Sequence, residues 1–259
     1  MNTLTLLRPV MSILCAGFSL SASLSAAEPS SSRCFELRTY FAAEGKLNDL
    51  NNRFKNHTIQ LLERHGMSNV AYWTPLENPE RKLIYLLSYP DLPSRETSWK
   101  AFLADPEWVA ARDASEANGA LVTKIESRFL TITEFSPEMK LREGDHTFEM
   151  RTYTTTPGNL PNLLDRFRAH TIALFSKHGM EHFGYFTPSV GQAGENNTLI
   201  YFLAHASPEA CKASFDAFRA DPDWVKAKNE SEAAAGGSLT VPDGVKSVLM
   251  KATGFSPVK

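Results

Sequence analysis

The sequence lacks the motifs by which several large enzyme classes are recognised. It contains no Cys-x-x-Cys pair, no Gly-x-Ser-x-Gly elbow, no Walker loop and no dinucleotide-binding glycine fingerprint. His178 and His182 are four residues apart, but Gly179 stands between them, so we do not expect them to share a helical face as zinc ligands. The sequence therefore gives no support for an acyl-transfer centre or a nucleotide site, and we expect neither a metal nor a cofactor.

An excess of charge of one sign and long apolar runs are also missing. With 27 Lys+Arg against 29 Asp+Glu, the formal net charge is −2, and no basic cluster is present that would release counterions from a phosphate backbone. We therefore expect no nucleic acid partner. Beyond the N-terminal segment, no stretch approaches the roughly 20 apolar residues of a membrane span, so we expect no transmembrane segment in the processed chain.

The first 27 residues have the three parts of a secretory signal peptide. Residues 2–8 are short and basic, residues 10–24 are apolar, and small residues follow up to Ala27. We expect cleavage after Ala27 and export to the periplasm or the extracellular space. Cys34 and Cys211 would then remain, and an oxidising compartment permits a bridge between them only if their Cα atoms lie within about 7 Å, which the sequence leaves open.

An internal repeat is the strongest feature of the chain. The sequence Phe-Glu-Leu-Arg-Thr-Tyr at residues 35–40 recurs 113 residues later as Phe-Glu-Met-Arg-Thr-Tyr. After a short insertion within residues 191–197 the offset becomes 116, which relates the two Ala-Asp-Pro-x-Trp segments at 104–108 and 220–224. Two copies are too few for a solenoid and indicate a fused dimer. The predicted organisation is a signal peptide at 1–27, module 1 at 34–137, a polar linker at 138–146 and module 2 at 147–257.

Each copy has the pattern of a ferredoxin-like βαββαβ module. In module 1, apolar and polar residues alternate over 35–40 as in a strand, and from Lys46 apolar residues recur at helical spacing until Gly66. The other expected elements are strands at 70–74, 83–87 and 128–133, a helix at 94–104, and a second helix for which Asp105 is the N-cap. We expect an α+β fold whose two modules pack either sheet against sheet or edge to edge as a barrel.

Four segments of each copy resemble the NIPSNAP domain. They are the strand Phe-Glu-x-Arg-Thr-Tyr, the helix that ends in His-Gly-Met, the strand that ends in Tyr-x-Thr-Pro, and the Ala-Asp-Pro-x-Trp corner. The resemblance covers nearly all of residues 34–257. It implies two tandem ferredoxin-like modules forming an intramolecular dimeric α/β-barrel. Proteins of that fold include cofactor-independent monooxygenases, haem-degrading enzymes and muconolactone-type isomerases, and mitochondrial NIPSNAP proteins are linked to vesicle traffic and partner recruitment. Fold kinship alone does not transfer an activity.

His57 and His170 are the candidate catalytic residues. Each occupies a position in the apolar stripe of its helix, so we expect it to point between helix and sheet. A half-buried imidazole near a ligand can act as a general base at neutral pH. The alternative is a core histidine whose ring nitrogens are hydrogen-bonded within the protein.

The polar face of the first strand supplies candidate ligand-binding residues. Glu36, Arg38 and Tyr40 alternate along it, and Arg151 and Tyr153 repeat the last two. If this face meets another sheet, a buried Arg must pair with a carboxylate or hold an anionic ligand, because an unpaired buried charge is costly. Further candidates are strand tyrosines that line an aromatic pocket or belong to the core: Tyr72, Tyr85, Tyr185 and Tyr201.

Two functional hypotheses follow from the sequence. The first is an exported pseudo-dimer of undefined molecular activity that binds a small molecule or a protein partner. The second is a cofactor-independent enzyme, monooxygenase- or isomerase-like, that acts on a small apolar or aromatic acid, with His57 or His170 as base and Arg38 or Arg151 as anchor. A cavity that reaches both the histidine and the arginine favours the enzyme, and a packed interior favours the interaction module.

Overall fold

The computed structural model describes Met1 and residues 33–141 and 143–259. Apart from Met1, the predicted signal peptide at 1–27 lies outside the described residues. Within them, no helix has the length and apolar character needed to cross a membrane.

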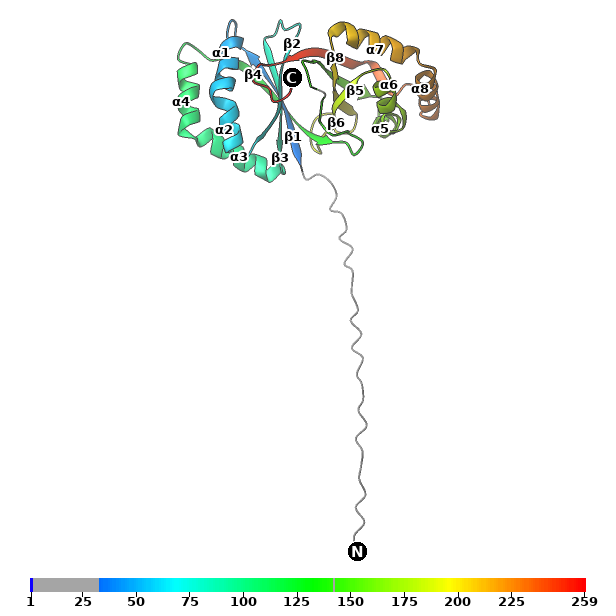
Figure 1. Cartoon of the computed structure of the whole chain (residues 1–259), viewed down its shortest axis with the longest axis horizontal. Coiled ribbons are helices and arrows are strands. Elements are labelled where there is room, and N and C mark those ends of the chain that lie inside the picture. The colour runs from blue at the N-terminus through cyan, green and yellow to red at the C-terminus, as the bar shows by residue number, and fades with distance from the viewer. Residues whose placement is uncertain (2–32, 142) are drawn as a thin grey trace. The chain divides into compact units, whose positions relative to one another are not determined.

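The two modules have the same order of elements (Figure 1). In both, the first helical segment is interrupted by one π-helical turn, named η1 and η2. Module 1 consists of β1 (Cys34–Ala42), α1 (Leu47–Arg53), η1 (Phe54–Thr58), α2 (Ile59–Arg64), β2 (Ser68–Pro75), β3 (Lys82–Tyr89), α3 (Leu92–Ala104), α4 (Pro106–Ser115) and β4 (Val122–Ile132). Module 2 consists of β5 (Thr147–Thr155), α5 (Leu160–Arg166), η2 (Phe167–Thr171), α6 (Ile172–Lys177), β6 (Glu181–Pro188), β7 (Thr198–His205), α7 (Pro208–Ala220), α8 (Pro222–Ala234) and β8 (Thr240–Ala252).

The eight strands close into one antiparallel barrel in the order β1-β3-β2-β8-β5-β7-β6-β4. The modules join at two seams, where β2 pairs with β8 and β4 pairs with β6. Trp73 lies opposite Ala252 at one seam, and Ile132 lies opposite Phe186 at the other. The helices of the two modules cover opposite sides of the barrel (Figure 1). The α+β class and the intramolecular barrel are thereby confirmed, and closure edge to edge removes the open strand edges of a single module.

The barrel interior is a shared aromatic core. Trp73 of module 1 stacks on Phe202 of module 2, with ring centroids 5.1 Å apart, and Phe35 meets Phe186 edge to face at 5.1 Å. Phe148 also contacts Trp73 across the modules. We refer to this cluster as the barrel core: Phe35, Ala71, Trp73, Ile84, Leu86, Leu130, Phe148, Phe183, Phe186, Ile200, Phe202, Ala204 and Met250.

The other face of β1, with Glu36, Arg38 and Tyr40, lies beneath the helices of its own module. Tyr40 packs there with Phe54 of η1 and with Tyr85 of β3. This polar face therefore meets helices and not another sheet, which was the condition considered for it in the sequence. The physical reason is that the barrel interior buries the apolar face of β1, so its polar face lies under the helices. Helix α3 and the neighbouring strands β3 and β4 supply the hydrogen-bonding partners of that face.

The predicted inward orientation of His57 and His170 is also wrong, because both side chains are exposed. Each lies within a π-helical turn, in which the backbone hydrogen bond spans five residues instead of four. The residues that follow therefore face a different side of the helix from the one that a continuous α-helix would give them. Thr58 takes the inward position, and its hydroxyl donates to the carbonyl of Arg53 at 3.2 Å. Thr171 donates to Arg166 in the same way at 3.2 Å.

The corner between the last two helices of each module is as the sequence predicts. The Asp105 side chain accepts a hydrogen bond from the backbone N–H of Glu107 at 2.8 Å, and Pro106 occupies the first helical position. Asp105 also contacts His65 Nε2 at 2.8 Å, which ties the end of α2 to the start of α4. This corner fixes the helices that cover the polar face of β1.

Candidate functional site

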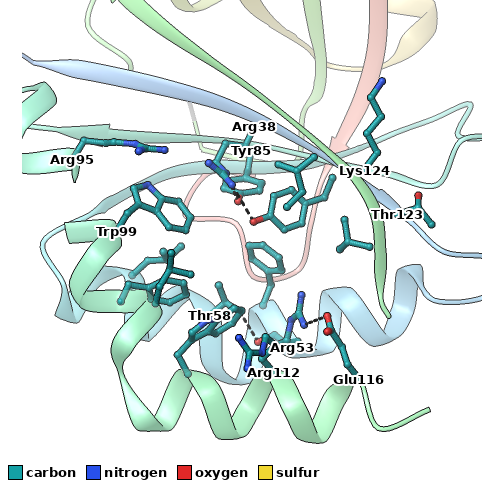
Figure 2. A pocket seen from close by; sticks show the side chains of 18 residues that line it. Arg38, Arg53, Thr58, Tyr85, Arg95, Trp99, Arg112, Glu116, Thr123 and Lys124 are labelled. Atoms are coloured by element: carbon teal, nitrogen blue, oxygen red, sulfur yellow. Dashed lines mark hydrogen bonds and ion pairs between the residues drawn. The ribbon is translucent and has the colours of Figure 1, made fainter. Parts of the chain in front are cut away.

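Module 1 has a cavity of about 610 Å³, partly open to solvent, between the outer face of the sheet and all four helices (Figure 2). The sheet contributes Arg38, Tyr40 and Tyr85, and the start of β4 contributes Lys124. Most of the wall is apolar or aromatic. The lining residues are Arg38, Tyr40, Arg53, Phe54, Thr58, Leu62, Tyr85, Arg95, Trp99, Phe102, Leu103, Trp108, Arg112, Glu116, Val122, Thr123, Lys124 and Ile125.

Glu36 lies behind the inner wall of this cavity and is completely buried. Arg95 of α3 donates to both of its carboxylate oxygens, each at 3.0 Å, and Arg38 forms an ion pair with Oε1. Tyr89 donates to Oε2 at 2.8 Å, and the indole N–H of Trp99 donates to the same oxygen at 3.2 Å. One carboxylate is therefore shared by two guanidinium groups, and Arg95 has a second acidic partner in the exposed Glu96, at 2.9 Å.

The ionisation of this cluster follows from its contacts. Burial would raise the pKa of Glu36, but the hydrogen bonds from Arg95, the charge of Arg38 and a hydrogen bond from Ser127 lower it to about 2. Burial opposes the charged form of Arg38, yet Tyr85, Tyr40 and Glu36 raise its pKa. The cluster is therefore fully charged at neutral pH.

The cavity wall carries more cations than anions. Five lining residues are cationic and one, Glu116, is acidic, and Glu116 pairs with Arg53 at 2.8 Å. Figure 2 shows Arg38 and Tyr85 on the sheet side, with Arg53, Arg112 and Glu116 on the helix side. Arg38 donates to the hydroxyl of Tyr85 at 2.9 Å, and its guanidinium lies 4.4 Å from the ring centroid of Trp99. Arg95, Arg112 and Lys124 also pair with exposed carboxylates outside the lining, those of Glu96, Asp113 and Glu126. The cavity thus combines an aromatic wall with cationic side chains whose acidic partners lie mostly outside it.

Module 2 has a smaller cavity, of about 360 Å³, at the matching place. Arg151 and Tyr153 line it as Arg38 and Tyr40 line the first cavity. The residues around the buried carboxylate differ, however. At the offset of 116, His205 replaces Tyr89, Cys211 replaces Arg95, and Phe215 replaces Trp99.

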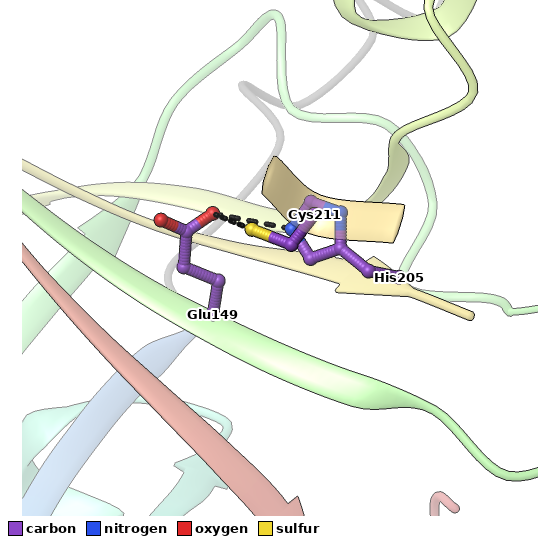
Figure 3. Close-up of side chains that lie close together, drawn as sticks. All are labelled: Glu149, His205 and Cys211. Atoms are coloured by element: carbon purple, nitrogen blue, oxygen red, sulfur yellow. Dashed lines mark hydrogen bonds and ion pairs between the residues drawn. The ribbon is translucent and has the colours of Figure 1, made fainter. Parts of the chain in front are cut away.

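These replacements change the charge around Glu149, which is the counterpart of Glu36. Arg151 donates to Glu149 at 2.6 Å, His205 Nε2 lies 3.1 Å from Oε2, and the Cys211 thiol lies 3.6 Å from the same oxygen (Figure 3). Burial would raise the pKa of Glu149, but the hydrogen bond from His205, the charge of Arg151 and a hydrogen bond from Ser247 lower it to about 2. Burial and Glu149 raise the pKa of Cys211 to about 12. One guanidinium therefore meets one carboxylate, and the pair is balanced.

The structure separates the residues that the sequence singled out. Arg38, Tyr40 and Tyr85 come together in the first cavity, and Arg151 and Tyr153 lie in the second. The remaining candidate tyrosines, Tyr72, Tyr185 and Tyr201, are buried and do not line either cavity; Tyr72 stacks on Tyr85, and Tyr185 stacks on Tyr201.

The histidine candidates lie away from both cavities. His57 lines a separate groove on the surface between α1 and α4, and His170 is exposed at the matching place in module 2. Cys34 is half-buried and Cys211 is buried, and both are free thiols.

Sequence reasoning missed the helical residues that complete the first cavity, namely Arg53, Arg95, Trp99 and Arg112. It also missed the cluster of Glu149, His205 and Cys211. Aligning the two copies gives a signal for the cluster, because Tyr89 and Arg95 both change to metal-binding residue types in module 2. For Arg53 no such signal exists, because helix periodicity does not distinguish it from a surface arginine.

Comparison with known proteins agrees with this architecture. The search of curated protein sequences found no match. A NIPSNAP-like domain protein from Burkholderia xenovorans is 21% identical over 41% of this chain and 90% of its own, with a TM-score of 0.38. A candidate monooxygenase from Fusobacterium nucleatum is 11% identical over 88% of this chain and 98% of its own, with a TM-score of 0.54. An anthrone oxidase-like protein is 12% identical over 86% of this chain and 92% of its own, with a TM-score of 0.56.

The last two structures extend over both modules and show a common fold, but identities this low carry no activity across. The family assignment comes from the sequence model of the NIPSNAP family, which matches residues 35–137 and again residues 148–257. These two matches coincide with the two halves of the barrel, so the chain belongs to the NIPSNAP family and carries two of its domains in tandem.

Proposed function

We propose that this chain is an exported binding protein for a small organic anion with an aromatic or apolar body, taken up in the module 1 cavity. The observation that carries the proposal is the wall of that cavity, in which five cationic side chains and one acidic side chain stand among aromatic rings. A volume of about 610 Å³ lies in the usual range for small-molecule sites, roughly 300–1,000 Å³. The signal-like composition of residues 1–27 supports export.

Charge and apolar surface select the ligand together. An anion is attracted because cationic side chains line the cavity, while most of their acidic partners lie outside its lining. Those partners are exposed, and exposed ion pairs are weak. The rings of Trp99 and Trp108 offer flat apolar surface to the rest of the ligand. An aromatic carboxylate satisfies both requirements, whereas a neutral aromatic satisfies one.

The alternative, a cofactor-independent enzyme, has less support from the described residues. His57 and His170 lie outside both cavities, and the carboxylate in the wall of the first cavity, Glu116, is paired with Arg53. Two structural neighbours are named as a candidate monooxygenase and as an anthrone oxidase-like protein, so oxygen uptake with a bound ligand is the reaction to assay. A protein-interaction role stays a prediction.

A matched pair of probes tests the proposal. Naphthoate and its neutral amide, naphthamide, differ in charge but hardly in shape, and binding is followed by quenching of Trp99 and Trp108 fluorescence. We expect naphthoate to bind about tenfold more tightly, a difference of about 1.4 kcal/mol. The double variant Arg112→Gln/Lys124→Gln should bind naphthoate more weakly and bind naphthamide with unchanged affinity.

Module 2 provides the control variant. Lys228, the counterpart of Arg112, lines the second cavity, so Lys228→Gln should leave naphthoate binding unchanged. Equal affinities for the acid and the amide, or an unchanged affinity in the double variant, would show that the cavity does not select anions.

A further inference from the structure

The buried cluster of Glu149, His205 and Cys211 has no role in the proposed anion site, which lies in the other module. The three side chains come from three elements, β5, the end of β7 and the first turns of α7. Their ligand atoms all lie within 4.8 Å of one another, and all three residues are buried. Carboxylate, imidazole and thiolate are the three ligand types that zinc uses in proteins.

Two of the three distances within the cluster match the edges of a tetrahedral zinc site, and the third is at most 4.8 Å. His205 Nε2 and Cys211 Sγ lie 3.1 and 3.6 Å from Glu149 Oε2. Metal–ligand bonds of about 2.0 Å to oxygen and nitrogen and about 2.3 Å to sulfur set these edges at about 3.3 and 3.5 Å. Figure 3 shows both side chains directed at the same carboxylate oxygen. An ion among them would require only small movements.

The other carboxylate oxygen is held from behind. Arg151 donates to Oε1 at 2.6 Å, and the Ser247 hydroxyl donates to the same atom at 2.5 Å. Outer hydrogen bonds of this kind orient a ligating carboxylate, leaving its second oxygen free for the ion. A carboxylate and a thiolate each bring one negative charge to a divalent cation, and with Arg151 included the site keeps a charge of +1 that an anionic fourth ligand would balance.

Module 1 shows what the same position looks like without metal ligands. There Tyr89 and Arg95 donate to Glu36, and neither a phenol hydroxyl nor a guanidinium competes for zinc as imidazole and thiolate do. Module 2 has replaced both with metal-binding residue types on the same carboxylate. The loss of Arg95 also removes one positive charge that would repel a cation.

We propose that Glu149, His205 and Cys211 form a mononuclear site for zinc or another thiolate-binding divalent cation in module 2. In the absence of an ion, protons occupy the same positions, with the thiol and the imidazole N–H donating to Oε2. Three protein ligands leave the fourth tetrahedral position open for an exchangeable ligand.

The test uses Co²⁺ as a probe, added to chelator-treated, reduced protein. We expect a thiolate-to-cobalt charge-transfer absorption that saturates at one Co²⁺ per chain and is lost when Zn²⁺ displaces the cobalt. Cys211→Ser should abolish the absorption, and the control Cys34→Ser should retain it. The double variant His205→Tyr/Cys211→Arg restores the donor set with which module 1 folds, and it should also bind no cobalt.

Two results would overturn the proposal: a wild-type spectrum that remains that of aqueous cobalt, or a charge-transfer absorption that persists in Cys211→Ser. Neither depends on naphthoate binding to module 1, so failure of the metal site and failure of the anion site are distinguished.

Discussion

At the scale of single residues, the two modules keep the same buried ion pair and change its surroundings. Arg38 with Glu36 and Arg151 with Glu149 repeat one geometry. Arg95 adds a second guanidinium in module 1, whereas Cys211 adds none in module 2. A single replacement therefore decides whether the buried carboxylate has two guanidinium partners or one.

These buried carboxylates predict how stability depends on pH. In the folded protein the pKa of Glu36 and of Glu149 is about 2, below the usual value of 4.5. Each contributes stability that is fully present above pH 4.5 and is lost as the pH falls through 2, by about 3 kcal/mol per carboxyl group. Urea unfolding of metal-free protein should show this decline. In Glu36→Gln the free energy of unfolding should fall less steeply below pH 4.5. An unchanged slope would contradict the lowered pKa of Glu36.

At the scale of elements, the π-helical turns decide which side chains reach the cavity. Thr58 faces inward and lines the first cavity, while the neighbouring His57 is exposed. The Thr58 hydroxyl donates to the carbonyl of Arg53, five residues earlier. A separation of five residues between donor and acceptor is that of a π-helical turn.

Two neighbouring substitutions therefore differ in effect. Thr58→Val removes a buried hydrogen bond and should lower the free energy of unfolding by about 1 kcal/mol. His57→Ala changes an exposed side chain and should stay within about 0.5 kcal/mol of the wild type, with naphthoate binding unchanged. Chemical unfolding and fluorescence titration check both variants. A larger loss in His57→Ala than in Thr58→Val would contradict the inward position of Thr58.

Some features of these elements could be predicted from the sequence, and others could not. Alternation along residues 35–40 predicts a strand, and Asp105-Pro106 predicts a helix start; both are confirmed because these signals are local. The face of β1 that the helices cover depends on barrel closure, which is a long-range property. The orientation of His57 was mispredicted because a strict α-helical period cannot represent a π turn. Arg53 and Trp99 reach the cavity through tertiary packing, which leaves no periodic signal.

At the scale of the whole molecule, the modules share one hydrophobic core and two strand seams. The repeat predicts the pseudo-dimer, and the resemblance to the NIPSNAP domain predicts the barrel, which the structure confirms. Because Trp73 packs against Phe148 and Phe202 of the other module, neither half has a complete core alone.

Unfolding should therefore be a single cooperative transition for both modules. Single-tryptophan variants that keep Trp99 in module 1 or Trp224 in module 2 should report the same midpoint. Phe148→Ala should lower both midpoints together, at a cost of about 3–5 kcal/mol. Separate midpoints, or a shift confined to the Trp224 signal, would mean that the modules fold independently.

Calorimetric titration of naphthoate into the wild type and into Arg95→Cys tests the central claim, that the surroundings of the buried carboxylate have diverged between the modules and that the anion site belongs to module 1. Cys211 occupies the equivalent position in module 2, so the fold accommodates this replacement. We predict one naphthoate per wild-type chain and an affinity about tenfold weaker in Arg95→Cys. Two equivalent sites per chain, or an affinity unchanged in Arg95→Cys, would contradict the account.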